Sequence, residues 1–176
     1  MTNDEIFLKL SERFPQGILG KEETKPDCSL KVDPSAIHEV LKFLRDELNF
    51  ETLHCVTGID YPALPALCVL YHPGSYTHKT IIALKVYLPR TDDAKVSSVT
   101  DLYKAANWHE RETYDMYGIQ FTNHPDLRRI LCPEDWVGFP LRKDYVTPDY
   151  YNGMPVPLSF GDDSAAEGGS TKEGAH

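Results

Sequence analysis

One stretch of the sequence, residues 33–48, limits the possible folds more than any other. Asp33 is a good N-cap residue, and Pro34 fits the first position of a helix, where its missing N–H costs nothing. The apolar residues that follow recur at helical spacing, opposite a charged side; they are Ile37, Val40, Leu41, Leu44 and Leu48. Because a helix with one apolar face must bury it, the sequence predicts a helix packed on a sheet.

Segments with strand character lie on both sides of this helix. Apolar and polar residues alternate over 28–32 and over 53–59, whereas 66–71 and 80–88 are apolar runs, the second rich in β-branched residues. Residues 72–75 (His-Pro-Gly-Ser) have turn chemistry, so they predict an antiparallel hairpin between the two apolar runs.

Two further helices complete the predicted core. Thr2 and Glu5 have the spacing of a capping box, at the start of a helix that reaches Phe14. Ser97 or Ser98 can cap another helix that runs through Ala106. The order of elements predicts an α+β fold over residues 1–120, a two-layer domain with a mixed sheet and helices on one face.

The pattern changes after residue 120. Residues 121–160 carry six prolines, with tryptophan, phenylalanine and tyrosines interleaved, and no period of a helix or strand. Such a long irregular segment is uncommon within a compact domain and too apolar for a solvated linker, so we expect an extended arm that binds a partner. Residues 161–176 are small, polar and acidic, and predict a disordered tail.

Charge and composition exclude several classes of function. The 18 Lys and Arg against 27 Asp and Glu give a net charge of −9, which opposes binding to nucleic acid or to anionic lipid. The longest apolar runs are far shorter than the ~20 residues that span a bilayer, and the acidic N-terminus does not resemble a signal peptide. The four cysteines form no close pair, which argues against an iron–sulfur cluster or structural zinc in this chain and favours reduced, mostly buried thiols.

The densest group of polar residues is Trp108-His109-Glu110-Arg111-Glu112, followed by Asp115. On a helix, His109, Glu112 and Asp115 share a face, and His124 could complete a metal site or an acid–base pair of a hydrolase. The same spacing arises on any charged helix, so a hydrogen-bonded structural network that involves Arg111 is the favoured alternative.

A second polar group follows, with adjacent cations at Arg128-Arg129 and at Arg142-Lys143. These pairs suit a phosphate or a partner's carboxylates, but equally suit neighbouring acidic residues of the same chain. The sequence has no glycine-rich phosphate loop and no GxSxG motif, so neither a nucleotide site nor a serine hydrolase is supported.

The segment Trp108–Tyr145 resembles a known family. Glu110-Arg111-Glu112, Asp115-Met116-Tyr117, His124, Arg128 and Ile130-Leu131 fill the signature of the 30-kDa subunit family of respiratory complex I, the family of the C subunit of NADH-quinone oxidoreductase. The run from Trp136 to Tyr145 (WVGFPLRKDY) is similar to the family's second block. The resemblance implies a non-catalytic structural subunit of the peripheral arm of a proton-translocating NADH:quinone oxidoreductase.

The resemblance also implies partners and roles. The chain would bind no cofactor, since FMN and the iron–sulfur clusters lie on other subunits, and would pack against the quinone-site large subunit on the cytoplasmic face of the bacterial membrane. Glu110, Arg111, Glu112 and Asp115 would form a charge network that fixes the turn from helix into arm. The expected partner-binding residues are His124, Arg128, Arg129, Trp136, Phe139, Arg142, Lys143 and Tyr145.

Two alternatives stay open. Related membrane-bound hydrogenases, and complexes fed by other electron donors, use similar subunits. A stand-alone metal-dependent hydrolase would instead use His109, Glu112, Asp115 and His124. The sequence does not identify the electron donor, the quinone, the ion that is moved, the number of subunits in the complex or the role of the tail.

Overall fold

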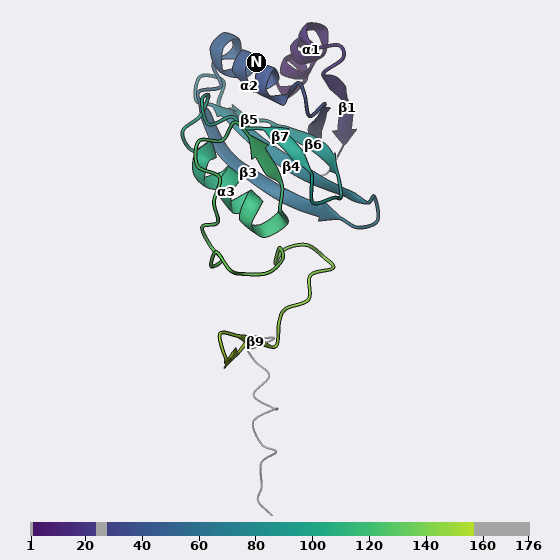
Figure 1. The fold of residues 1–176 in the computed structure, drawn as a ribbon. Coiled ribbons are helices and arrows are strands. Elements are labelled where there is room, and N and C mark those ends of the chain that lie inside the picture. The colour runs from purple at the N-terminus through teal and green to yellow at the C-terminus, as the bar shows by residue number, and fades with distance from the viewer. Residues whose placement is uncertain (1, 24–27, 157–176) are drawn as a thin grey trace, which may run out of the picture. The chain divides into compact units, whose positions relative to one another are not determined.

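The computed structural model describes residues 2–23 and 28–156 (Figure 1). The chain divides into two compact units, Met1–Tyr145 and Val146–His176. The described helices and the main sheet belong to the first unit. Its elements are α1 (Asn3–Arg13), β1 (Ile18–Glu23), β2 (Cys28–Val32), α2 (Ile37–Leu48), β3 (Thr52–Tyr61), β4 (Ala66–Ser75), β5 (Thr80–Ile81), β6 (Ala83–Pro89), β7 (Lys95–Ser97), α3 (Ala106–Tyr117) and β8 (Gln120–Thr122).

The main sheet is mixed, as predicted. Its strand order is β1-β2-β6-β4-β3, with β5 beside β4. Strand β2 runs parallel to β6, and the other pairs are antiparallel. A separate parallel pair joins β7 to β8. The connection between the parallel strands β2 and β6 passes through α2, β3, β4 and β5. Of the two longest strands, β4 lies inside the sheet and β3 at its edge.

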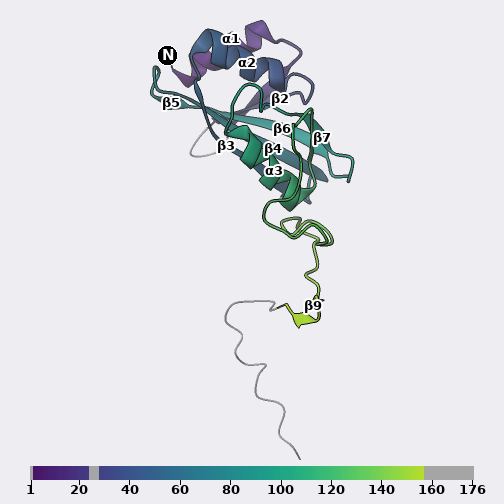
Figure 2. The same cartoon turned by 60° about the vertical axis from the view of Figure 1, so that its left-hand side comes forward.

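One face of this sheet carries the core. Val56, Tyr71, Leu84 and Leu30 lie side by side on neighbouring strands and are buried together. All three helices contribute side chains to the same apolar cluster. The rings of Phe14 and Phe43 meet edge to face and pack the end of α1 against α2, which lie together in Figure 2. The α+β prediction is confirmed.

Several local predictions are also confirmed. Thr2 and Glu5 form both hydrogen bonds of a capping box at the start of α1. The alternating segments 28–32 and 53–59 are strands of the sheet. The helix at residues 37–48 buries its entire apolar stripe.

The start of α2 was predicted too early. The helix begins at Ile37 and not at Pro34, and residues 34–36 form a turn. The Asp33 carboxylate accepts hydrogen bonds from the amide and hydroxyl of Ser35, so Asp33 stabilises this turn in place of a helix N-terminus.

Two other boundaries were wrong. Strand β4 continues through residues 72–75, where Gly74 pairs with Thr52 of β3, and the turn follows at residues 76–79. Residues 99–105 form turns, so α3 begins only at Ala106. Ser98 caps no helix, because its hydroxyl donates to the carboxylate of Glu110.

The first unit also extends past residue 120, where the core was expected to end. Residues 121–145 belong to the same compact unit as the sheet. Within the second unit, Tyr150–Tyr151 (β9) and Met154–Pro155 (β10) form a small antiparallel pair. The predicted tail at 161–176 lies outside the described residues. In the part of the chain that is described, no helix has the length and apolarity needed to cross a membrane.

Candidate functional site

The densest polar group of the sequence, Trp108–Glu112 with Asp115, lies on α3, which packs along β3 (Figure 1). The helix ends at Tyr117 and is capped by Gly118, whose φ of 75° is the left-handed conformation that glycine adopts without strain. Three charged residues of α3 are buried, namely Glu110, Arg111 and Asp115. Since an unpartnered buried charge is costly, each of them requires specific partners.

Asp115 anchors the chain that follows β8. Its Oδ2 accepts hydrogen bonds from the backbone N–H groups of Ile130 (3.0 Å), Leu131 (2.7 Å) and Cys132 (2.9 Å). Its Oδ1 accepts one from Nη1 of Arg129 at 3.1 Å. Burial by itself would raise the pKa of Asp115, but the three amides and the Arg129 charge outweigh it and lower the pKa. The carboxylate is therefore held ionised and fixes residues 129–132 against α3.

A second set of contacts continues from Arg129 along the chain. Arg129 also donates to the carbonyl oxygen of Gly138 at 2.9 Å. The guanidinium groups of Arg129 and Arg142 lie 5.5 Å and 4.6 Å from the centroid of the Phe139 ring, within the range of cation–π attraction. Arg142 donates to the carbonyl oxygen of Tyr117, the last residue of α3, at 2.8 Å. These contacts hold residues 138–142 over the C-terminal end of α3.

A third anchor comes from the sheet. Asp60, at the end of β3, accepts a bidentate pair of hydrogen bonds from Arg90 at 2.7 and 2.8 Å. It also accepts the backbone N–H of Lys143 at 2.8 Å, and Arg90 in turn contacts both carboxylate oxygens of Asp144. The hydrogen bonds and charge of Arg90 lower the pKa of Asp60 despite its burial. Residues 129–144, which we call the clamped segment, are thus tied to the core at both ends.

Gly118 is the point where the clamped segment comes closest to α3. A Cβ placed there would lie 2.5 Å from Cε2 of Phe139 and 2.8 Å from Nη2 of Arg142. We expect Gly118→Ala to destabilise the protein by about 1–2 kcal/mol, because the positive φ strains alanine and the ring must move. Denaturant unfolding checks this value. In a Phe139→Leu background the additional cost should shrink, and an undiminished cost there would show that the ring is not the obstacle.

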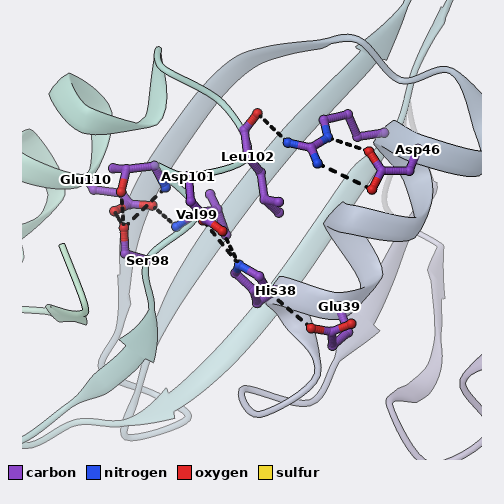
Figure 3. A network of polar contacts seen from close by, with 10 residues as sticks. His38, Glu39, Asp46, Ser98, Val99, Asp101, Leu102 and Glu110 are labelled. Atoms are coloured by element: carbon purple, nitrogen blue, oxygen red, sulfur yellow. Dashed lines mark hydrogen bonds and ion pairs between the residues drawn. The ribbon is translucent and has the colours of Figure 1, made fainter. Parts of the chain in front are cut away.

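Glu110 and Arg111, the other two buried charged residues of α3, contact parts of the chain other than the clamped segment. The Glu110 carboxylate accepts from the Ser98 hydroxyl at 2.7 Å and from the Val99 amide at 2.8 Å (Figure 3). Glu110 therefore fixes the loop before α3, and not the turn after the helix as expected. Arg111 donates to the carbonyl oxygen of Arg128 at 3.3 Å and lies over the ring of Trp108.

The structure does not assemble the residues of the hydrolase hypothesis into a site. Asp115 is occupied by the amides of residues 130–132, and the side chain of Glu112 is exposed. His124 Nδ1 accepts the amide of Asp126, so its Nε2 carries the proton and faces the carbonyl oxygen of Asn107. Burial lowers the pKa of His124 and favours this neutral form. Among residues 2–23 and 28–156, no three His, Cys, Asp or Glu side chains are placed to hold a metal ion.

The residues expected to bind a partner fall into two groups. Arg129, Phe139 and Arg142 make the contacts described above within the chain, and the ring of Tyr145 lies close to Gly138. Arg128 and Lys143 are exposed, whereas Trp136 and His124 are half-buried. Partner binding by these residues stays a prediction, and their contacts within the chain give several of them a positioning role.

The clamped segment presents apolar side chains that the sequence analysis did not select. Leu131, Val137 and Leu141 are 62%, 84% and 48% exposed. The polar anchors lie on the side of the segment that faces the core, so these three side chains are left toward solvent. Exposed apolar residues that recur on one ordered segment are typical of a protein–protein interface.

Sequence reasoning also missed Asp60 and Arg90. Asp60 follows Val56 and Gly58 at two-residue intervals in β3, and it therefore points to the core face of the sheet. An acidic residue at a core-facing strand position requires a buried partner, so the position of Asp60 in the alternating pattern could have indicated a buried ion pair. Its partners come from the residue that follows β6 and from residue 143, and nothing local in the sequence connects them.

Comparison with known proteins covers both the sheet and the clamped segment. The family model described as "Respiratory-chain NADH dehydrogenase, 30 Kd subunit" matches residues 30–151. The C subunit of NADH-quinone oxidoreductase from Chlorobium phaeobacteroides is 47% identical over 153 residues, which cover 83% of this chain and 90% of that protein. The C subunit of F(420)H(2) dehydrogenase from Methanosarcina mazei is 42% identical over 142 residues, which cover 80% and 89%.

A solved structure shares the fold. A chain of the membrane-bound sulfane sulfur reductase, an archaeal respiratory membrane complex, superimposes with a TM-score of 0.66 at 24% identity. The match covers 81% of this chain and 85% of that chain. At this identity the likeness establishes the architecture of the α+β unit.

Proposed function

Because this chain belongs to the 30-kDa subunit family of respiratory-chain NADH dehydrogenases, we propose that it is a structural subunit of an NADH:quinone oxidoreductase. The observation that carries the proposal is its 47% identity to the C subunit of such an enzyme over 90% of that protein's length. In this role the chain supports electron transfer from NADH to quinone without an active site of its own. The FMN and iron–sulfur clusters belong to partner subunits, and the complex holds the chain at the cytoplasmic face of the membrane.

The arrangement of the clamped segment supports a scaffold role. The side chains of Arg129 and Arg142 and the backbone amide of Lys143 hold the segment on α3 and β3, whereas several of its apolar side chains are exposed. A preorganised surface of this kind binds a partner without the entropy cost of ordering a flexible arm. We assign the contact with the quinone-site large subunit to Leu131, Val137 and Leu141, with Arg128 and Lys143 as exposed charged neighbours.

Deletion of the gene tests the proposed function directly. Membranes that lack this chain should lose NADH-dependent reduction of a quinone analogue, and the wild-type gene should restore it. Unchanged quinone reduction in the deletion strain, measured as the fraction of activity that a specific inhibitor of the complex blocks, would refute the role in this complex.

The docking assignment gives a prediction of its own. Replacing both Leu131 and Val137 by aspartate should reduce recovery of the partner subunits with a tagged chain by about tenfold or more, since two apolar contacts become buried charges at the interface. The free energy of unfolding should change by less than about 0.5 kcal/mol, because both side chains are exposed in this chain.

Leu8→Asp is the matched control. Leu8 is 61% exposed on α1, far from the clamped segment in the sequence. This variant should recover partners as the wild type does. Equal recovery from the double variant and the control would remove the docking assignment and leave the subunit role intact.

A second candidate shares the scaffold role but changes the electron donor. The 42% identity to the C subunit of F(420)H(2) dehydrogenase favours a complex of that type as the alternative. Membranes assayed with NADH and with reduced F420 separately distinguish the two. Quinone reduction that depends on this chain with reduced F420 alone would select the alternative.

A further inference from the structure

A buried carboxyl on α3 is not needed by the docking role. Glu110 is completely buried, and its carboxylate accepts only from the Ser98 hydroxyl and the Val99 amide among the described residues. No lysine, arginine or histidine of those residues forms an ion pair with it, whereas Asp115 on the same helix has Arg129. Glu110 thus differs from the anchoring carboxylates, because its charge is buried without a countercharge.

The groups that face Glu110 from the neighbouring elements do not supply one. The Tyr71 hydroxyl of β4 is buried without a hydrogen-bond partner in the described structure; burial raises its pKa, and the Glu110 charge raises it further. Asp101, in the loop before α3, repels the Glu110 carboxylate and is paired with His38 of α2. Burial raises the pKa of Glu110 to about 7, and the bonds from Ser98 and Val99 offset this only in part.

The hydrogen bonds around Ser98 accommodate both protonation states. The Ser98 Oγ lies 2.7 Å from Oε2 of Glu110 and 2.9 Å from Oγ1 of Thr100, and it accepts the Thr100 amide. With Glu110 ionised, Ser98 donates to the carboxylate and Thr100 donates to Ser98. With Glu110 protonated, the carboxyl O–H donates to Ser98, whose hydroxyl turns and donates to Thr100. In both states the Ser98 hydroxyl donates to one of these oxygens, and protonation of Glu110 turns the O–H of the half-buried Thr100 away from Ser98.

We propose that Glu110, Ser98 and Thr100 form a buried proton-binding site that takes up a proton as the pH falls through the neutral range, and that the protonated form holds the loop 98–103 to α3 more firmly. This loop connects β7 to α3 and is also fastened to α2. Asp101 bonds to His38, and the Leu102 carbonyl oxygen accepts from Arg45 at 3.1 Å (Figure 3). Proton uptake at Glu110 therefore changes the stability of a loop that contacts both α2 and α3 and follows β7.

The sign of the effect follows from the two states of the chain. In the unfolded chain the carboxyl titrates near its ordinary pKa of 4.5, and in the folded chain near 7. The folded state binds the extra proton between these values, so this stabilisation is fully present below 4.5 and is lost as the pH rises through about 7. We expect the unfolding equilibrium constant to rise by about 100-fold from this group alone between pH 4.5 and 8.

The test is a pH titration of the full-length protein labelled with ¹³C at the glutamate carboxyl carbons, followed by NMR. One resonance should titrate with a midpoint near 7, and it should be missing in Glu110→Gln. The glutamine can keep both contacts, since its oxygen accepts from Val99 and its amide donates to Ser98. Glu112→Gln, at an exposed site on the same helix, should leave that resonance in place.

Ser98→Ala separates proton binding from a purely structural role, because only proton binding predicts a change in the titration midpoint of Glu110. Loss of the hydroxyl removes a bond that favours the ionised carboxylate, so the midpoint of the Glu110 resonance should shift upward. A wild-type spectrum in which every glutamate titrates below about pH 5.5, within the range of ordinary glutamates, would overturn the proposal. That spectrum needs no variant, so the result holds even where a variant fails to fold.

Discussion

Replacing Asp115 by alanine is expected to destabilise the protein by about 3–5 kcal/mol, the range found when one partner of a buried charge network is removed. The change would leave the amides of Ile130, Leu131 and Cys132 without their acceptor, and Arg129 without its carboxylate. The effect should be visible in denaturant unfolding. Trypsin should also cut the variant faster after Arg129, because the chain there is no longer held on α3.

Asp126→Ala is the matched control, since the Asp126 carboxylate pairs with Arg128 where both side chains are largely exposed. It should change stability by less than about 0.5 kcal/mol.

The difference in the free energy of unfolding between wild type and Asp115→Ala should shrink in acid. The folded pKa of Asp115 lies below its ordinary value of 3.8, so its contribution is present above that value and is lost as the pH falls through the folded pKa. Equal stability of the two proteins at neutral pH would contradict the anchoring role.

Replacing Asp60 by alanine is expected to cost about 2–4 kcal/mol, less than the loss of an isolated buried ion pair. The variant leaves the Lys143 amide without its acceptor and removes two of the bonds to Arg90, but Arg90 is 20% exposed and keeps Asp144, which limits the loss. Hydrogen exchange at Lys143 should accelerate by more than that of amides in β4.

Asp92→Ala serves as the comparison for this second anchor. Asp92, like Asp60, accepts a hydrogen bond from the clamped segment, in this case from Arg142, but its side chain is 85% exposed. Its removal should leave both the stability and the exchange at Lys143 nearly unchanged. If the two aspartate variants behaved alike, the burial of Asp60 would not explain its role.

The sequence predicted the elements of this fold well where one apolar face decides the structure. The stripe from Ile37 to Leu48 and the alternation in residues 53–59 define α2 and β3, because each pattern can bury its apolar side in only one way. Boundaries were harder to predict where polar side chains compete for the backbone. Asp33 accepts hydrogen bonds within a turn, and Ser98 donates to Glu110, although both residue types are equally common at a helix N-terminus.

The candidate site was predictable only in part. The sequence identified Asp115 as a member of a polar network, but its main partners are backbone amides, and these carry no side-chain signature. Phe139 and Arg142 suited a partner surface as well as an intrachain stack, since an aromatic ring and a cation serve both. The exposure of Leu131 and Val137 could not be predicted from the sequence either. Only the positions of the anchoring contacts show which side of the segment faces solvent.

The most direct test of the account is extraction of native membranes in mild detergent with a tag on this chain, followed by identification of the co-purifying proteins and an assay of NADH oxidation by a quinone analogue. We predict that the quinone-site large subunit and iron–sulfur subunits co-purify with the tagged wild-type chain, together with NADH:quinone activity. These partners should be lost when the tagged chain carries both Leu131→Asp and Val137→Asp. Recovery of the wild-type chain alone, from membranes that retain the activity, would contradict its place in the complex.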